Sequence, residues 1–193
     1  MKTREQISIE RKNAAVDTTP RIYVACLSSY NAGVLHGRWI DCDQGEDHIE
    51  EEVQAMLKES SQQFAEEWAI HDHQFMGPVT ESTDFATCAE IGYAVSTASD
   101  SDAFLEWLDY QNIMDIGAVT GDHLIMDFDE QFHGLHDSPK DFAYDLYIDQ
   151  YHENELGPLA NHIDWESVWN DLRCGGDFYS VRANGGVYIF SHS

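Results

Sequence analysis

Basic residues are scarce along most of this 193-residue chain. Between residues 41 and 171 there are 32 Asp and Glu residues but only two basic ones, Lys58 and Lys140. The formal charge of the whole chain is −26. Such a protein repels nucleic acids and anionic membranes, and it attracts basic surfaces over a long range. We therefore expect no nucleic acid and no membrane as a partner, and instead a protein with a basic face.

Several features that would indicate a secreted or membrane protein are missing. No apolar run approaches the roughly 18 residues that a transmembrane helix needs. We find no signal-peptide pattern, and the four cysteines form no C-x-x-C pair. Scattered cysteines of this kind are typical of buried thiols in a reducing compartment. Together these absences predict a cytoplasmic protein.

Motifs of known catalytic chemistry are missing as well. The sequence contains no G-x-S-x-G, G-x-x-x-x-G-K or G-x-G-x-x-G. The acidic segment that begins at Asp127 lacks the Gly and Glu of a calcium loop. His71 and His73 flank Asp72 on a predicted strand, where residues two apart point to one face, but no third ligand follows at a recognisable spacing. We predict no metal and no cofactor, with a metal-dependent enzyme that uses this segment as an alternative.

The predicted elements divide the chain into an N-terminal tail and three small domains. Residues 1–20 are expected to be a disordered tail. Residues 21–78 are predicted to be an α+β domain with a three-stranded antiparallel sheet. The elements of this domain are strands at 21–27, 35–42 and 68–75, a loop at 28–33, and an amphipathic helix at 46–58.

The rest of the chain is predicted to hold an acidic helical domain at 79–136 and a second α+β domain at 137–193. The helical domain has predicted helices at 84–96, from the cap at 100 or 101 onward, and at 122–131. The last domain has a helix at 137–155, a short helix capped by Asp164, and strands at 178–182 and 187–190 around an Asn-Gly-Gly turn. The predicted fold class is therefore α+β, with a highly acidic surface.

One predicted helix carries a line of acids at every fourth position. These acids are Asp137, Asp141, Asp145, Asp149 and Glu153. On an α-helix they lie about 6 Å apart, from four residues at a rise of about 1.5 Å each. Like charges at this spacing oppose helix formation. The line therefore indicates a purpose other than folding stability.

Acids on several successive helices can imitate the charge of a nucleic acid. Duplex DNA carries one charge per about 3.4 Å of each strand, so a carboxylate every turn or two is of comparable density. A solvated acidic face, an adaptation to high salt, and a module that sequesters basic DNA-binding proteins are alternatives that the pattern leaves open. We predict that the phosphate-mimicking acids are Glu46, Glu50, Glu51, Asp102, Glu106, Asp109, Asp122, Asp127, Asp129, Glu130, Asp137, Asp141, Asp145, Asp149 and Glu153.

Three stretches of the chain follow a known family pattern. The first is I-Y-V-A-C-L-S-S-Y-N-A-G-V-L-H-G-R-W at residues 22–39, and the second is W-A-I-H-D at 68–72. The third runs from I-D-W at 163–165 to D-L at 171–172 and continues into the last two strands. In this order the stretches resemble the ArdA-type antirestriction proteins, which conjugative plasmids, transposons and phages carry. His73 departs from that pattern, which has Tyr there.

The resemblance implies a binding protein and not an enzyme. ArdA-type proteins resemble B-form DNA in shape and charge, and they occupy the DNA-binding groove of type I restriction–modification enzymes. They thereby block restriction, and sometimes methylation, in the host bacterial cell. They are elongated homodimers with three small domains per chain. The resemblance places the dimer contact in the third domain, whose aromatic stripe is otherwise core: Tyr147, Tyr151, Trp165 and Trp169.

Overall fold

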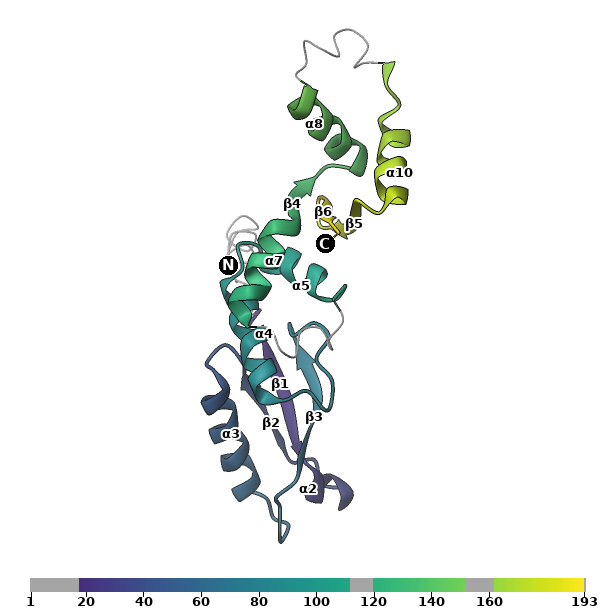
Figure 1. The fold of residues 1–193 in the computed structure, drawn as a ribbon. Helices are drawn as coiled ribbons and strands as arrows, with labels where there is room; N and C mark the ends of the chain where they lie inside the picture. The colour runs from purple at the N-terminus through teal and green to yellow at the C-terminus, as the bar shows by residue number, and fades with distance from the viewer. Residues whose placement is uncertain (1–17, 112–119, 152–161, 193) are drawn as a thin grey trace, which may run out of the picture. The chain divides into compact units, whose positions relative to one another are not determined.

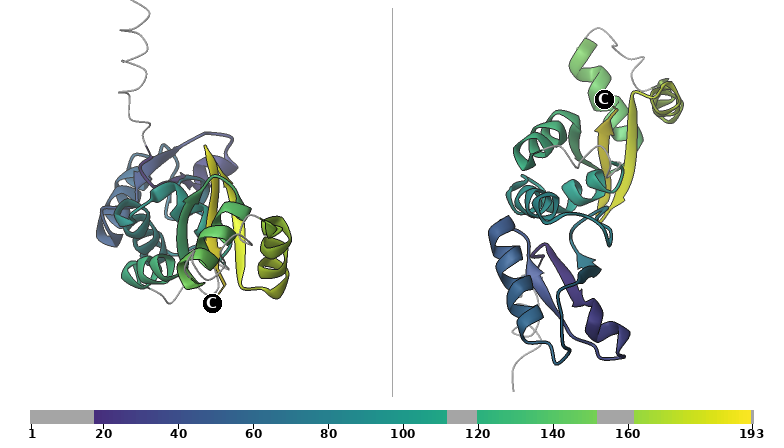
Figure 2. Two further views of the ribbon diagram at one scale, coloured as in Figure 1. Left: turned by 90° about the horizontal axis from the view of Figure 1, so that it is seen from above. Right: turned by 60° about the horizontal axis from the view of Figure 1, so that its bottom comes forward.

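A computed structural model describes residues 18–111, 120–151 and 162–192 (Figures 1 and 2). These residues form two three-stranded antiparallel sheets and seven helices, which confirms the α+β fold class. The contacts between Cα atoms divide the chain into two compact units, Met1–Ser96 and Thr97–Ser193. None of the helices in the described ranges is long and apolar enough to cross a membrane.

The first unit is an antiparallel sheet with a long helix packed on it. Its elements are β1 (Arg21–Cys26), α2 (Leu27–Asn31), β2 (Gly37–Asp41), α3 (Glu46–Lys58), β3 (Trp68–Gln74) and α4 (Phe85–Thr97). The strand order is β2-β1-β3, and α3 contacts β1 and β2. The predicted strands, the predicted sheet and the helix at 46–58 are confirmed. Figure 1 shows α3 running alongside the sheet.

The short helix α2 stands where the sequence predicted a loop. The amide of Ala32 donates hydrogen bonds to the carbonyls of Ser28 and Ser29, and the amide of Gly33 donates to Tyr30. A helix of five residues is too short to show a repeating apolar pattern, so its sequence looks like that of a turn. The prediction of a turn or loop at 28–33 was therefore wrong for residues 28–31, whereas Ala32 and Gly33 do form a turn.

Apolar residues at helical spacing hold α3 to the sheet. Ile49, Val53, Met56 and Leu57 are buried, α3 contacts β1 and β2, and Ile22 of the central strand is buried as well. Helix α4 approaches the backbone of Cys42, the residue that follows β2, very closely. A Cβ atom at Gly92 would lie 2.5 Å from the carbonyl carbon of Cys42, so only glycine permits this approach.

The second unit is built around the other sheet. Its elements are α5 (Ser101–Leu108), α7 (Gly121–Gln131), β4 (Phe132–His136), α8 (Pro139–Tyr151), α10 (Trp165–Gly175), β5 (Phe178–Ala183) and β6 (Gly186–Ser191). The strand order is β4-β6-β5, and both pairs are antiparallel. Ala183 pairs with Gly186 across a two-residue turn, in which Gly185 has a φ of +97°. The predicted hairpin is confirmed.

Strand β4 was not predicted. Residues 132–136 were expected to lie at the end of the acidic helical domain at 79–136. In the structure Gly134 has a φ of +95°, and the pairing with β6 shifts register between Phe132 and Leu135. A glycine at an irregular position of this kind allows the strand to bend. The partner strand lies about fifty residues later, so no local pattern reveals the pair.

Helices cover both faces of the second sheet. On one face Phe190 of β6 lies 6.3 Å from Phe128 of α7, between ring centroids, and Phe128 contacts Phe104 of α5 at 5.2 Å. On the other face Ile189 belongs to a buried cluster with Phe142 of α8 and Trp169 of α10. Adjacent residues of a strand point to opposite faces. Strand β6 therefore contributes to two cores at once.

Candidate interaction surface

Helix α3 presents acids on the side opposite its buried residues. Glu46, Glu50 and Glu51 are exposed, whereas Glu52 and Glu59 at the edge of the helix are paired inside the unit. Arg38 of β2 donates to Glu52 at 2.7 Å and to Glu59 at 2.9 Å. The hydrogen bonds to Glu52 and then Glu59 raise the pKa of Arg38. The three outer glutamates thus form a surface that is separate from this ion-pair network.

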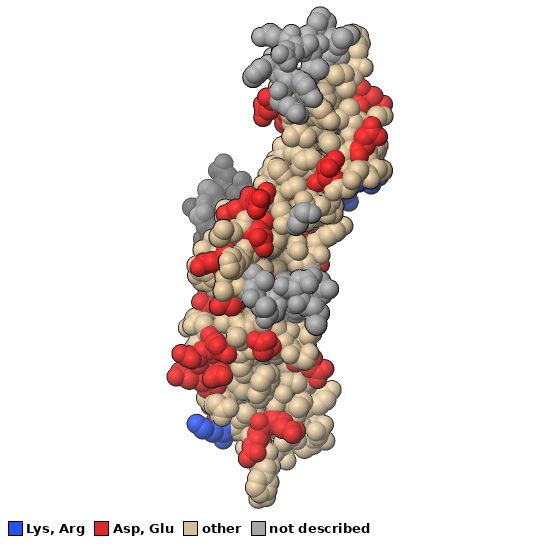
Figure 3. Space-filling view, in the orientation of Figure 1, with Lys and Arg blue, Asp and Glu red and all other residues tan. Residues whose placement is uncertain are grey.

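The helices α5 and α7 expose acids as well. Asp100 and Thr120 cap their N-termini, and each side chain accepts a hydrogen bond from a backbone amide of the first turn. This confirms the first of the two caps predicted for the helix that begins at residue 100 or 101. Figure 3 shows carboxylates on the visible face of each unit. The exposed acids of these two helices are Asp102, Glu106, Asp109, Asp122, Asp127, Asp129 and Glu130.

The acid line of α8 is divided between solvent and the protein itself. Asp137, Asp145 and Asp149 are exposed, whereas Asp141 is half-buried. The Ser138 hydroxyl donates a hydrogen bond to the Asp141 carboxylate at the start of the helix. An Asp145 oxygen lies 3.8 Å from Nδ1 of His136. The end of the predicted helix, with Glu153, lies outside the described residues.

The aromatic residues of α8 and α10 differ in how deeply they are buried. Trp169 is only 6% exposed, and its ring meets that of Phe142 edge to face. Trp169 therefore belongs to the core, which was one of the two alternatives for this stripe. Tyr147 and Trp165 are half-buried, with ring centroids 6.2 Å apart. The side chain of Tyr151 lies outside the described residues.

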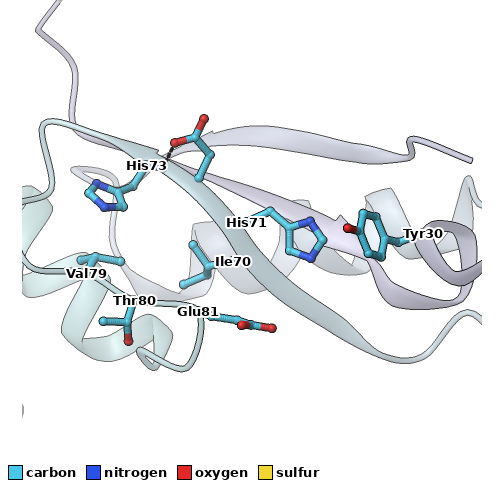
Figure 4. A pocket seen from close by; sticks show the side chains of 8 residues that line it. Tyr30, Ile70, His71, His73, Val79, Thr80 and Glu81 are labelled. Atoms are coloured by element: carbon cyan, nitrogen blue, oxygen red, sulfur yellow. Dashed lines mark hydrogen bonds between the residues drawn. The ribbon is translucent and has the colours of Figure 1, made fainter. Parts of the chain in front are cut away.

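His71 and His73 do not converge on a common point. The pairing of β3 with β1 shifts register between the partners of Tyr23 and Val24, which disturbs the regular alternation of β3 at His71. In Figure 4 the His71 ring lies beside Tyr30, whereas the His73 ring lies toward Val79. In the described ranges no group of three or more His, Cys, Asp or Glu residues is arranged to hold a metal ion. The metal-dependent alternative therefore gains no support.

A pocket of about 570 Å³ opens beside these histidines. It brings together α2, β3 and the segment that follows β3, and its lining includes Tyr30, Asp72, Val79 and Glu81. The His71 ring meets Tyr30 nearly edge to face, with centroids 4.8 Å apart. No motif in the sequence indicates this pocket. Its residues are scattered over about fifty positions, and only the fold gathers them.

The cysteines are divided between the core and the surface. Cys26, Cys42 and Cys88 are buried, as predicted, but Cys174 is exposed at the end of α10. Burial raises the pKa of Cys42 and raises the pKa of Cys88 to about 12. Both thiols therefore stay protonated at neutral pH and are poor nucleophiles. This arrangement agrees with a structural role for the buried cysteines.

The sequence model of the antirestriction protein (ArdA) family matches residues 22–187. This chain belongs to that family. The match covers the whole first sheet and continues into β6, so it includes the acid-bearing helices of both units. No curated protein sequence matches the chain. Membership in a family of antirestriction proteins implies that this ArdA-family chain interacts with restriction enzymes.

Proposed function

We propose that this protein inhibits type I restriction–modification enzymes by imitating B-form DNA. Its acids engage the Lys and Arg residues with which the enzyme otherwise holds phosphates, and the chain occupies the DNA-binding groove. Restriction of incoming DNA is thereby blocked, and methylation is a second step that the same occupancy obstructs. The protein carries out no reaction of its own and needs no cofactor.

The family match carries this proposal, because it spans 166 of the 193 residues. The position of the acids supports it further. Exposed carboxylates lie on α3, α5, α7 and α8, while each of these helices also buries apolar residues on another side. On α8 the spacing of about 6 Å between successive acids is close to twice the phosphate spacing of one DNA strand.

Three further statements belong to the same proposal. The chain keeps the three domains expected from the sequence, at 21–78, 79–136 and 137–193 after a tail at 1–20, with β4 (Phe132–His136) joining the sheet of the third domain. It acts as a homodimer through the third domain, where the half-buried Tyr147 and Trp165 offer aromatic surface of a kind enriched at interfaces. It works in the cytoplasm of the host bacterium, because restriction enzymes meet incoming DNA there.

Competition with duplex DNA tests the mechanism. The purified chain is added to the DNA-recognition and methyltransferase core of a type I enzyme that holds a labelled duplex. We expect displacement of the duplex at low salt. We also expect binding to weaken about tenfold or more between roughly 50 and 200 mM salt, because the contacts are ionic. Binding that is equally strong at both salt concentrations would contradict the proposal.

A second measurement separates DNA mimicry from simple sequestration of basic proteins. The chain is titrated into a histone-like protein and into the type I core under the same conditions. A mimic of duplex geometry binds the type I core more tightly than a generic basic protein of similar charge. Equal affinity for both partners favours the sequestering module.

In cells, the corresponding test is the plating efficiency of unmodified phage on a type I host with and without the protein.

A further inference from the structure

The pocket beside β3 has an apolar floor and a polar rim. Ile70 and Val79 are 3% and 5% exposed and form the floor. Tyr30 is 53% exposed at the rim, and Asp72 and Glu81 are exposed there as well. This combination suits a ligand that has both an apolar stem and a polar head.

The rim attracts positive charge. The lining contains two carboxylates and neither Lys nor Arg. Asp72 uses one oxygen to accept a hydrogen bond of 2.8 Å from the backbone amide of His73, so the carboxylate is held in place while its second oxygen stays available. In Figure 4 the side chain of Glu81 extends toward the side of the pocket on which Tyr30 lies.

The Tyr30 ring keeps about half of its surface exposed to a cation in solvent. The His71 ring packs against Tyr30 at an interplanar angle of 83°, which restrains the aromatic side chain while half of it remains in solvent. A guanidinium over an aromatic face is attracted by the quadrupole of the ring, and arginine uses this contact more often than lysine. Ring, carboxylates and apolar floor together match the parts of one arginine side chain.

We infer that this pocket receives an arginine side chain of the target restriction enzyme. The inference rests on the proposed function and adds to it a specific contact that a phosphate backbone does not offer. The arginine stem lies on Ile70 and Val79, and its guanidinium lies between Tyr30 and the carboxylate of Glu81, while Asp72 adds negative charge at the rim. The charged helices attract the enzyme, and the pocket fixes one point of the docked complex.

A substitution that leaves the charge unchanged separates the pocket from the general acidity. We expect Tyr30→Leu to weaken competition with duplex DNA about two- to fivefold, the range of an exposed cation–π contact. Tyr30→Phe keeps the aromatic face and should compete like the wild type. Circular dichroism and thermal unfolding check that both variants are folded. Wild-type competition by Tyr30→Leu would overturn the inference while leaving the proposed function intact.

A small probe tests the pocket without any restriction enzyme. N-acetyl-arginine amide is titrated into the full chain, and the ring protons of Tyr30 and His71 are followed by NMR. The uncharged N-acetyl-citrulline amide is the matched control. We expect saturable shifts with the arginine probe only, and we expect Glu81→Gln to reduce them. If neither probe shifts these protons more than the other, the pocket is not an arginine site, whatever the result of the competition assay.

The chain itself contains a competing occupant, because Arg4 and Arg11 lie in its N-terminal segment. The double variant Arg4→Gln/Arg11→Gln distinguishes this source from the enzyme. We expect the variant to bind the arginine probe with wild-type affinity. Severalfold tighter binding of the probe would mean that these arginines already fill the pocket, and the assignment to the enzyme would then be wrong.

Discussion

Helices α3 and α8 are both acidic and both thirteen residues long, but they combine charge and stability in different ways. In α3 four buried apolar residues hold the helix to the sheet, and the outer glutamates take no part in that core. In α8 only Phe142 and Ala143 are buried among the side chains that the structure describes. Asp141 also helps to begin this helix.

The difference shows how an acidic surface can be tolerated by a folded chain. Where the apolar face of a helix is large, the repulsion between its acids costs little of the total stability. Where the apolar face is small, the acids have to contribute local contacts. Neutralising the outer acids of α3 should therefore weaken binding with little change in stability. Changes to the acids of α8 should affect both binding and stability.

Phe142→Ala should have the largest effect on stability. Removal of a buried Phe side chain costs about 3–5 kcal/mol of the free energy of unfolding, and Phe142 is the larger of the two buried side chains that the structure describes on α8. Chemical denaturation measures the loss, and hydrogen exchange should find the α8 amides unprotected. The matched change Met56→Ala leaves three buried residues on α3, so its amides should remain protected. Full protection of α8 in Phe142→Ala would contradict the comparison.

Neutralising three acids on each helix should weaken binding to a similar extent. At roughly 0.5 kcal/mol per surface charge, each block should reduce competition with DNA about tenfold. The blocks are Glu46→Gln/Glu50→Gln/Glu51→Gln and Asp141→Asn/Asp145→Asn/Asp149→Asn. The α8 block should lower the free energy of unfolding more than the α3 block does, because Asp141 also accepts a hydrogen bond from Ser138, and urea denaturation would measure the difference. A single neutralisation that abolishes competition would indicate one specific site instead of a distributed surface.

Asp141→Asn should destabilise α8 more than Asp149→Asn does. Asp141 lies in the first turn, where it accepts a hydrogen bond from Ser138 and interacts favourably with the helix dipole. Asparagine still has an oxygen that can accept from Ser138, but it lacks the charge that interacts with the dipole, which is worth about 0.3–1 kcal/mol. Asp149 lies near the other end of the helix, where a negative charge is unfavourable, so its neutralisation should be neutral or slightly stabilising. Equal melting temperatures for the two variants would argue against a capping role for Asp141.

The smallest effect should be a pH dependence at His133 of β4. Burial lowers the pKa of His133, and neighbouring His136 lowers it further. The unfolded chain therefore takes up a proton first as the pH falls below about 6.5, and the stabilisation is lost between that pH and the folded pKa. The free energy of unfolding of the wild type, minus that of His133→Gln, should decrease over this range. A constant difference between pH 5 and 8 would contradict this assignment.

Local patterns predicted the helices with wide apolar faces. The bounds of α3 agree with the prediction because its apolar spacing, its acidic first turn and Lys58 in its last turn all lie within one segment. The caps at Asp100 and Asp164 were predictable for the same reason, since a cap bonds to residues two or three positions away. Strand β4 was not predictable, because its hydrogen bonds go to a strand about fifty residues later.

The candidate surface was predicted in part. The outward acids of α3, α5 and α7 follow directly from helical periodicity. The half-buried state of Asp141 depends on Ser138 and on the packing of α8, and the pocket at Tyr30 depends on three segments meeting. These features involve contacts between distant residues, and periodicity contains no information about such contacts.

The sequence by itself determined the charge of this protein, the faces of its helices and its family. Residues three or four apart share a helix face whatever surrounds the helix, so charge and periodicity can be read directly. Only the tertiary structure decided that Trp169 is core, that β6 serves two cores, and that Tyr30, Asp72 and Glu81 line one pocket. The physical reason is that the burial of a side chain, and the meeting of side chains in one pocket, depend on contacts between segments that are distant in the sequence.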